Sequence, residues 1–176
     1  MRKVLLLVLF ACLLFPQGAG AQVVSADSTR AYYNRLRTPS LITRETKNKR
    51  EGPVPTLKSI PVDDTNSLLY NEDRSFVYLG STGVFRKKSI PDGYGMSRII
   101  VQDRETGERG YLYCLCPWVR EQRQGDAVMK LPNGTYCKAV WKWNSLKSIL
   151  DEAPSPEEIA QIEKYITRLT ILLKWL

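Results

Sequence analysis

Apolar and polar residues alternate through much of residues 97–143, with the period of two that is typical of half-buried β-strands. This stretch holds three of the four tryptophans and every cysteine except Cys12. Asn133-Gly134 separates two alternating segments, 127–131 and 135–143, and an Asn-Gly pair in this position predicts a tight β-hairpin. The pattern therefore predicts an antiparallel meander as the core of the protein.

Residues 110–119 are apolar on both faces of the expected strand. A strand of this kind is predicted to be central in its sheet and covered by a layer on each side. One face carries Leu112, Cys114, Cys116 and Trp118, and the other carries Tyr111, Tyr113, Leu115, Pro117 and Val119. Further strands are expected at 68–70, 75–79, 84–87 and 98–102, with turns or loops at 80–83, 90–95, 103–108 and 120–126.

The end of the chain has helical periodicity instead. Ser155-Pro156 followed by Glu158 is a helix start, with serine as N-cap, proline at the first helical position and glutamate closing a capping box. Beyond it, one helix face carries Ile159, Ile162, Tyr165, Ile166, Leu169, Leu172, Leu173 and Leu176. Shorter helices are expected over 25–37, capped by Ser25 or Asp27, and over 144–152, capped by Asn144.

Ile171 and Trp175 fall on the polar side of the C-terminal helix. Either they touch the rim of the sheet, or they form an exposed apolar spot for a partner or a membrane surface.

Together these patterns predict an α+β fold, in which an antiparallel sheet of about five to seven strands carries the C-terminal amphipathic helix on one face. Four segments are expected along the chain. They are a signal peptide (1–21), a basic and largely irregular arm (22–66), the β domain (67–143) and a helical segment packed on the sheet (144–176).

The first 21 residues have the features of a secretory signal peptide. Arg2 and Lys3 are followed by an apolar run over 4–15, which is too short to span a bilayer. Small residues end the segment, so we expect cleavage after Ala21 and a periplasmic or secreted protein. Lipoprotein processing at Cys12 is the alternative, and an uncleaved anchor is a third.

Positive charge is concentrated in the expected arm. Without residues 1–21 the chain has 24 basic and 18 acidic residues, a net charge of +6, and five of these charges lie between residues 22 and 61. The arm is either a solvated linker or an electrostatic segment that lies on an anionic partner. An envelope protein, a glycan or an anionic surface are the expected partners. Nucleic acid is not an expected partner, because the arm has few aromatic residues for base stacking.

The chain contains no histidine, which excludes Ser-His-Asp and Cys-His catalysis and histidine-ligated zinc. It also lacks a glycine-rich phosphate loop, and its acidic residues follow no catalytic motif. The sequence therefore predicts no catalytic residue, cofactor or metal site.

Three cysteines remain beyond the leader, namely Cys114, Cys116 and Cys137. In an oxidising compartment we expect one disulfide, between Cys137 and either Cys114 or Cys116, or three buried thiols. A Cys114–Cys116 bridge is disfavoured, because two residues of an extended strand separate the Cα atoms by about 6.6 Å, near the upper limit for disulfides.

Two further surface features are expected. Tyr111, Tyr113 and Tyr136 form a candidate binding face for a sugar or a peptide if that side of the sheet is open. Asn133 begins an N-glycosylation sequon, although the hairpin turn explains the same residues.

The function predicted from the sequence is that of an exported, non-enzymatic envelope or secreted protein that binds or scaffolds. A small hydrolase or thiol-based enzyme without histidine is one alternative, and a peripheral membrane protein is another.

Overall fold

The computed structural model describes residues 25–38 and 57–176, so the leader, Cys12 and residues 39–56 of the expected arm lie outside the described residues. In chain order the elements are α2 (Ala26–Arg35), β1 (Leu36–Arg37), β2 (Lys58–Pro61), β3 (Ser67–Tyr70), β4 (Phe76–Phe85), β5 (Lys88–Asp103), β6 (Arg109–Val119), β7 (Gln122–Arg123), β8 (Gly125–Lys130), β9 (Tyr136–Lys142), β10 (Ser145–Ile149) and α4 (Pro156–Lys174).

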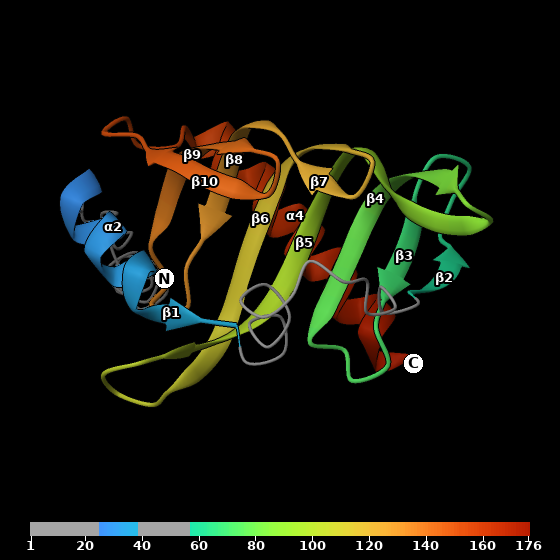
Figure 1. The fold of residues 1–176 in the computed structure, drawn as a ribbon, viewed down its shortest axis with the longest axis horizontal. Helices are drawn as coiled ribbons and strands as arrows, with labels where there is room; N and C mark the ends of the chain where they lie inside the picture. The colour runs from blue at the N-terminus through green and yellow to red at the C-terminus, as the bar shows by residue number, and fades with distance from the viewer. Residues whose placement is uncertain (1–24, 39–56) are drawn as a thin grey trace, which may run out of the picture.

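The strands form one antiparallel sheet (Figure 1). Its order is β10-β9-β8-β6-β5-β4-β3-β2, with β1 added beside β5 and β7 beside β6. The predicted antiparallel meander with a C-terminal helix is therefore confirmed, but the sheet has ten strands instead of five to seven. The additional strands β1, β2, β7 and β10 are short, and they lie in segments whose composition predicted an arm, a loop or a helix.

The glycine-rich segment 80–83 is not the hairpin loop that was predicted. It lies inside β4, with a register shift between Gly80 and Thr82, and the hairpin turns at Arg86 and Lys87 instead. Gly80 pairs with Gly95 of β5. A Cβ atom on Gly80 would come within 2.4 Å of the Gly95 Cα, and one on Gly95 within 2.4 Å of the Tyr78 hydroxyl, so neither position has room for a side chain. The predicted loop over 90–95 is likewise part of β5.

The helix predicted over 144–152 is also wrong. Trp143 and Asn144 both have positive φ, +52° and +61°, and form a tight turn that leads into β10. Asn144 stabilises this turn and not a helix. Its Oδ1 accepts from the Arg123 backbone N–H at 2.8 Å, and its Nδ2 donates to the Glu121 carbonyl at 3.3 Å.

Each face of the sheet carries its own apolar cluster, as the two-faced pattern of β6 predicted. On the face covered by α2, which we call the α2 face, Cys114, Trp118, Met129 and Trp141 are buried, and Tyr33 packs against them. On the opposite α4 face, the buried residues are Leu68, Val77, Leu79, Met96, Leu115, Val128, Ile162 and Leu169.

Helix α4 crosses the α4 face, behind the strands in Figure 1. It begins with the predicted capping box, in which the Ser155 hydroxyl accepts from the Glu158 N–H at 3.2 Å and the Glu158 carboxylate accepts from the Ser155 N–H at 2.7 Å. Glu163 then accepts from Lys130 at 2.8 Å and from the Tyr136 hydroxyl at 2.6 Å. These polar contacts fix the position of the helix on β8 and β9.

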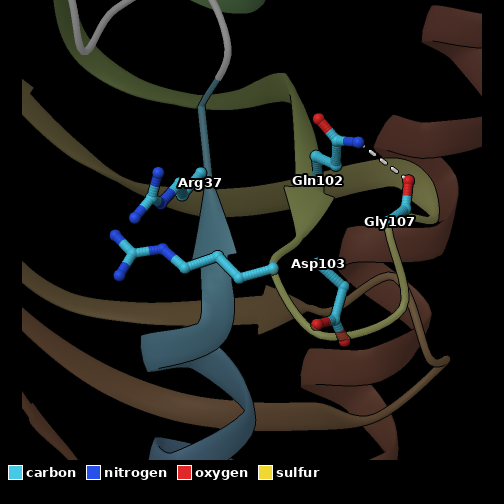
Figure 2. Close-up of a pocket in the computed structure, with 5 residues that line it drawn as sticks. Arg37, Gln102, Asp103 and Gly107 are labelled. Atoms are coloured by element: carbon cyan, nitrogen blue, oxygen red, sulfur yellow. Dashed lines mark hydrogen bonds between the residues drawn. The ribbon is translucent and has the colours of Figure 1, made fainter.

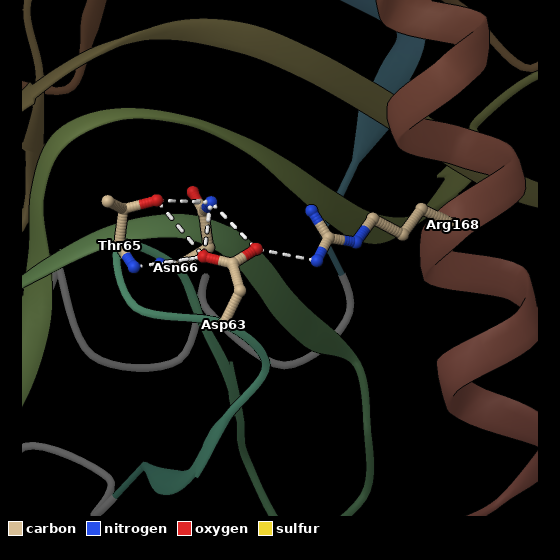
Figure 3. Close-up of polar contacts among 4 residues, drawn as sticks. All are labelled: Asp63, Thr65, Asn66 and Arg168. Carbon is tan, nitrogen blue, oxygen red and sulfur yellow. Dashed lines mark hydrogen bonds and ion pairs between the residues drawn. The ribbon is translucent and has the colours of Figure 1, made fainter.

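A second polar contact holds α4 to the turn between β2 and β3 (Figure 3). Arg168 donates to Asp63 at 2.6 Å, and Asp63 also accepts from Thr65 and Asn66. The hydrogen bond from Arg168, followed by that from the Thr65 backbone, lowers the pKa of the Asp63 carboxyl.

Candidate functional site

The candidate site lies where α2 and β1 meet the end of β5. Ser25, one of the two N-caps that the sequence offered, caps α2, with its hydroxyl accepting from the Ser28 N–H at 3.2 Å. The chain leaves the helix at Leu36 and pairs at once with β5, Leu36 opposite Asp103 and Arg37 opposite Gln102. This pairing brings a basic segment near the N-terminus against the loop between β5 and β6.

A pocket of about 310 Å³ opens at this junction (Figure 2). It is lined by Arg37, Gln102, Asp103, Arg104 and Gly107. This volume is at the lower end of the range for small-molecule sites, which suits a single charged group better than a large ligand.

Arg35 neutralises the acidic side of the pocket. It forms ion pairs with Asp103 and with Glu105, at 2.5 and 2.6 Å. The hydrogen bond from Arg35, followed by that from the Glu105 N–H, lowers the pKa of the Asp103 carboxyl. Asp103 is therefore ionised at neutral pH and already paired with a cation.

Arg37 and Arg104 differ from Arg35 in their surroundings. Both side chains are exposed, and neither forms an ion pair with any residue in the described part of the chain. Figure 2 shows the Arg37 side chain extending away from the Asp103 carboxylate. Two guanidinium groups that line one pocket without a counter-ion among the described residues provide a fork-shaped set of donors for a carboxylate, phosphate or sulfate.

The wall of the pocket is held in place by its own hydrogen bonds. Gln102 Nε2 donates to the Gly107 carbonyl at 2.9 Å, and the Gly107 N–H donates to the Asp103 carbonyl at 2.9 Å. Gly107 has φ +75°, a conformation that glycine adopts without strain. The Arg104 N–H donates to the Arg35 carbonyl at 3.1 Å, which ties the loop to the end of α2.

Sequence reasoning did not find this pocket. Arg37 was only one of the basic residues of the arm, and Arg104 was part of a loop between strands. The signal that was present is the excess of positive charge close to a short helix. What it could not provide is the pairing of residue 37 with residue 102, because nothing local in either segment specifies that contact.

The three cysteines are free thiols, and all three are buried on the α2 face. Cys114 lies opposite Met129, which lies opposite Cys137, so a whole strand separates Cys114 from Cys137. Two interstrand spacings put their Cα atoms about 9–10 Å apart, beyond the roughly 7 Å limit for a disulfide. The structure therefore shows no disulfide at Cys137 but three buried thiols, the alternative that the sequence left open, and the sulfurs of Cys114 and Cys116 lie 3.8 Å apart.

Arg123 lies beside this thiol pair, between two tryptophan rings. Its guanidinium is 5.2 Å from the Trp118 ring centroid and 4.6 Å from that of Trp141. Burial raises the pKa of the Cys114 thiol, but Cys116, Arg123 and the Trp141 indole together outweigh burial and lower it. The hydrogen bond with Cys114, and then burial, raise the pKa of Cys116.

The tyrosine face is largely closed by α4. Tyr113 and Tyr136 pack partly buried against the apolar cluster of the α4 face, and the Tyr136 hydroxyl is used by Glu163. Tyr111 is exposed, and Arg98 lies 4.5 Å from its ring centroid. The rings of Tyr111 and Tyr113 lie side by side, with centroids 6.1 Å apart, so a binding face that includes Tyr136 stays a prediction.

Ile171 and Trp175 are both exposed, with 53% and 85% of their surface accessible, which favours the exposed apolar spot over burial at the rim of the sheet. A second apolar spot, which the sequence did not single out, lies at the tip of the β4–β5 hairpin, where Val84 is 81% exposed beside Phe85.

Asn133, the first residue of the sequon, lies in the β8–β9 turn, and its Oδ1 accepts from the Thr135 N–H at 3.1 Å.

Comparisons with protein-family models, with curated proteins and with solved structures find no match for this chain. Among the helices that the structure describes, none is long and apolar enough to cross a membrane.

Proposed function

We propose that this is an exported binding protein that recognises an anionic group through the pocket beside β1. The observation that carries the proposal is that Arg37 and Arg104 line one pocket while, among the described residues, Arg35 forms the ion pairs with Asp103 and Glu105. An oxyanion would supply the counter-charge that the two arginines lack. The ligand class is therefore a carboxylate, phosphate or sulfate, as carried by acidic glycans, lipid head groups and acidic proteins of a cell envelope.

The enzymatic alternatives have less support. Cys116 is fully buried and its pKa is raised, the opposite of what a thiolate nucleophile needs. The pocket carboxylate, Asp103, is occupied by Arg35 and has a lowered pKa, so it is a poor general acid.

The test is calorimetric titration of the mature chain with three probes, namely trigalacturonate, glycerol 3-phosphate and neutral maltotriose. We expect at least one of the two anionic probes to bind, with an affinity that falls as salt is added, and maltotriose not to bind. The anionic probe that binds more tightly distinguishes a carboxylate source from a phosphate source.

Arg37→Gln and Arg104→Gln should each weaken that binding about tenfold or more, since a hydrogen bond to a charged group contributes about 1.5–3 kcal/mol. Arg30→Gln is the matched control, because Arg30 is an exposed arginine of α2 that does not line the pocket. Equal losses in all three variants would show that only net charge matters, and would contradict a site at the pocket.

A second candidate function, attachment to an anionic membrane, is favoured by the tip of the β4–β5 hairpin. Val84 and Phe85 are exposed there and are followed by Arg86, Lys87 and Lys88, none of which forms an ion pair with a described residue. Apolar side chains next to several cations suit the surface of a bilayer with anionic lipids.

Sedimentation with phosphatidylglycerol vesicles tests this candidate, with phosphatidylcholine vesicles as the neutral comparison. Val84→Ser combined with Phe85→Ser should abolish binding, and Ile171→Ser combined with Trp175→Ser should not. The reverse result would move the contact to the end of α4, and binding that neither pair affects would contradict both sites.

A further inference from the structure

The buried polar groups of the α2 face, which the proposed function does not use, include a positive charge without a carboxylate partner. Arg123 is only 9% exposed and forms no ion pair with any residue the structure describes. Its Nε–H and the indole N–H of Trp118 are buried without a hydrogen-bond acceptor among the described residues. A buried guanidinium and unsatisfied donors are costly unless an anion completes the site.

Two thiols on the same face, those of Cys114 and Cys116, can supply negative charge when they lose their protons. They project from the same face of β6, 3.8 Å apart, and both residues are completely buried. Cys114 is close enough to Arg123 and Trp141 for both groups to stabilise its thiolate. Met129 adds a thioether sulfur to the same cluster, directly across from Cys114.

We propose that Cys114 and Cys116 bind one soft monovalent cation, Cu(I), with Arg123 as the counter-charge of the complex. Thiolate and thioether ligands select Cu(I) over harder ions. On binding, the two S–H bonds lose their protons to solvent, two S–Cu bonds form, and copper remains in the +1 state without electron transfer. The Cu(I) bis-thiolate unit carries one negative charge, which the buried guanidinium balances.

The same charge balance argues against zinc. A Zn(II) bis-thiolate unit is neutral and would leave Arg123 without a counter-ion, and zinc also requires four ligands. Within residues 25–38 and 57–176 there is no cluster of three or more His, Cys, Asp and Glu side chains that could hold a metal ion. Formation of a disulfide does not compete well either, because an extended strand holds the two cysteines near the upper limit of Cα separation for a disulfide.

Helix α2 provides the route of entry. Tyr33 packs on the cluster from α2 and is near enough to Cys114 and Arg123 to interact with both electrostatically. Arg35 holds the end of the helix through Asp103 and Glu105 at the protein surface. Local release of α2 would therefore expose the thiol pair without disrupting the sheet.

The test is a competition between the reduced mature chain and the coloured Cu(I)–bicinchoninate complex, without oxygen. We expect the wild type to withdraw one Cu(I) per chain, Cys114→Ser and Cys116→Ser to withdraw none, and Cys137→Ser to behave as the wild type. Arg123→Gln should bind about 10- to 100-fold more weakly, the usual effect of removing a group that supports the ligands. Binding that Cys137→Ser abolishes and Cys114→Ser preserves would overturn the assignment.

X-ray absorption of the copper-loaded wild type does not depend on whether the variants fold. It should show sulfur as the only nearest neighbour of copper, and nitrogen or oxygen neighbours would overturn the proposal. Failure of the wild type to take any Cu(I) from bicinchoninate would overturn it too, while leaving the pocket at Arg37 and Arg104 unaffected. Tyr33→Ala should take up Cu(I) faster at the same stoichiometry, and an unchanged rate would contradict entry beneath α2.

Discussion

Tyr78 illustrates how single residues determine the shape of the sheet. Its side chain is completely buried, its ring lies 5.3 Å from that of Trp118, and its hydroxyl donates to the Ser81 carbonyl at 2.8 Å. Gly80 and Gly95 lie opposite each other, and Gly95 has no room for a Cβ atom because the Tyr78 side chain occupies that space. The glycines serve close packing, whereas their spacing in the sequence favoured a turn. Sequence alone could not distinguish these roles, because the distinction depends on a contact between two strands.

Gly95→Ala should lower the free energy of unfolding by about 1–3 kcal/mol, since the added methyl group overlaps the Tyr78 ring in a well-packed core. Gly83→Ala is the control. Its Cβ would meet mainly the Asp92 side chain, which can move, so we expect a change within about 0.5 kcal/mol. Urea denaturation of both variants measures the difference, and equal losses would contradict the role assigned to Tyr78.

At the scale of elements, those specified by local signals were predicted well. The capping box at Ser155 and the Asn133-Gly134 turn correctly located α4 and the β8–β9 hairpin. Strand β10 was predicted as a helix, because Asn144 is both a good N-cap and a good residue for a turn with positive φ. Pairing with β9 decides between these outcomes, and that pairing is not a local property.

Two residues of α4 that lie close in sequence but differ in burial should contribute differently to the free energy of unfolding. Leu169 is 1% exposed and Ile171 is 53% exposed. Leu169→Ala should therefore cost about 2–5 kcal/mol of unfolding free energy, and Ile171→Ala less than about 0.5 kcal/mol. Thermal or urea unfolding of the two variants measures this, and a large loss for Ile171→Ala would mean that the exposed face of α4 is covered in solution.

The attachment of α2 should depend on pH. The Asp103 carboxyl, which pairs with Arg35 at the end of α2, has a lower pKa in the folded protein than in the unfolded chain. The stabilisation of the folded state by this ion pair is therefore fully present above about pH 4 and is lost as the pH falls through the lowered pKa. Hydrogen exchange in residues 26–35 should therefore accelerate in acid before exchange in β6 does. Asp103→Asn should show the faster exchange already at neutral pH, and a wild-type α2 that remains as protected as β6 in acid would contradict this.

At the scale of the molecule, the turns at one end of the strands differ in chemistry from the turns at the other end. The β4–β5 turn and β7 lie at one end, and the β5–β6 loop with β1 lies at the other (Figure 1). The first end presents apolar and basic residues, including Val84 and Arg86. The second holds the arginine pocket. Composition predicted a basic protein with an anionic partner, but only the pairing of β1 with β5 assigns that charge to a pocket.

The most direct test of anion recognition compares two double variants that lose the same charge. Arg37→Gln/Arg104→Gln removes both pocket arginines, and Arg30→Gln/Lys164→Gln removes two exposed cations elsewhere on helices α2 and α4. In calorimetric titration with the anionic probe that the wild type binds more tightly, we predict that the first double variant loses detectable binding and that the second retains the wild-type affinity to within a factor of about three. Retained binding by Arg37→Gln/Arg104→Gln, or equal losses in both, would contradict the account.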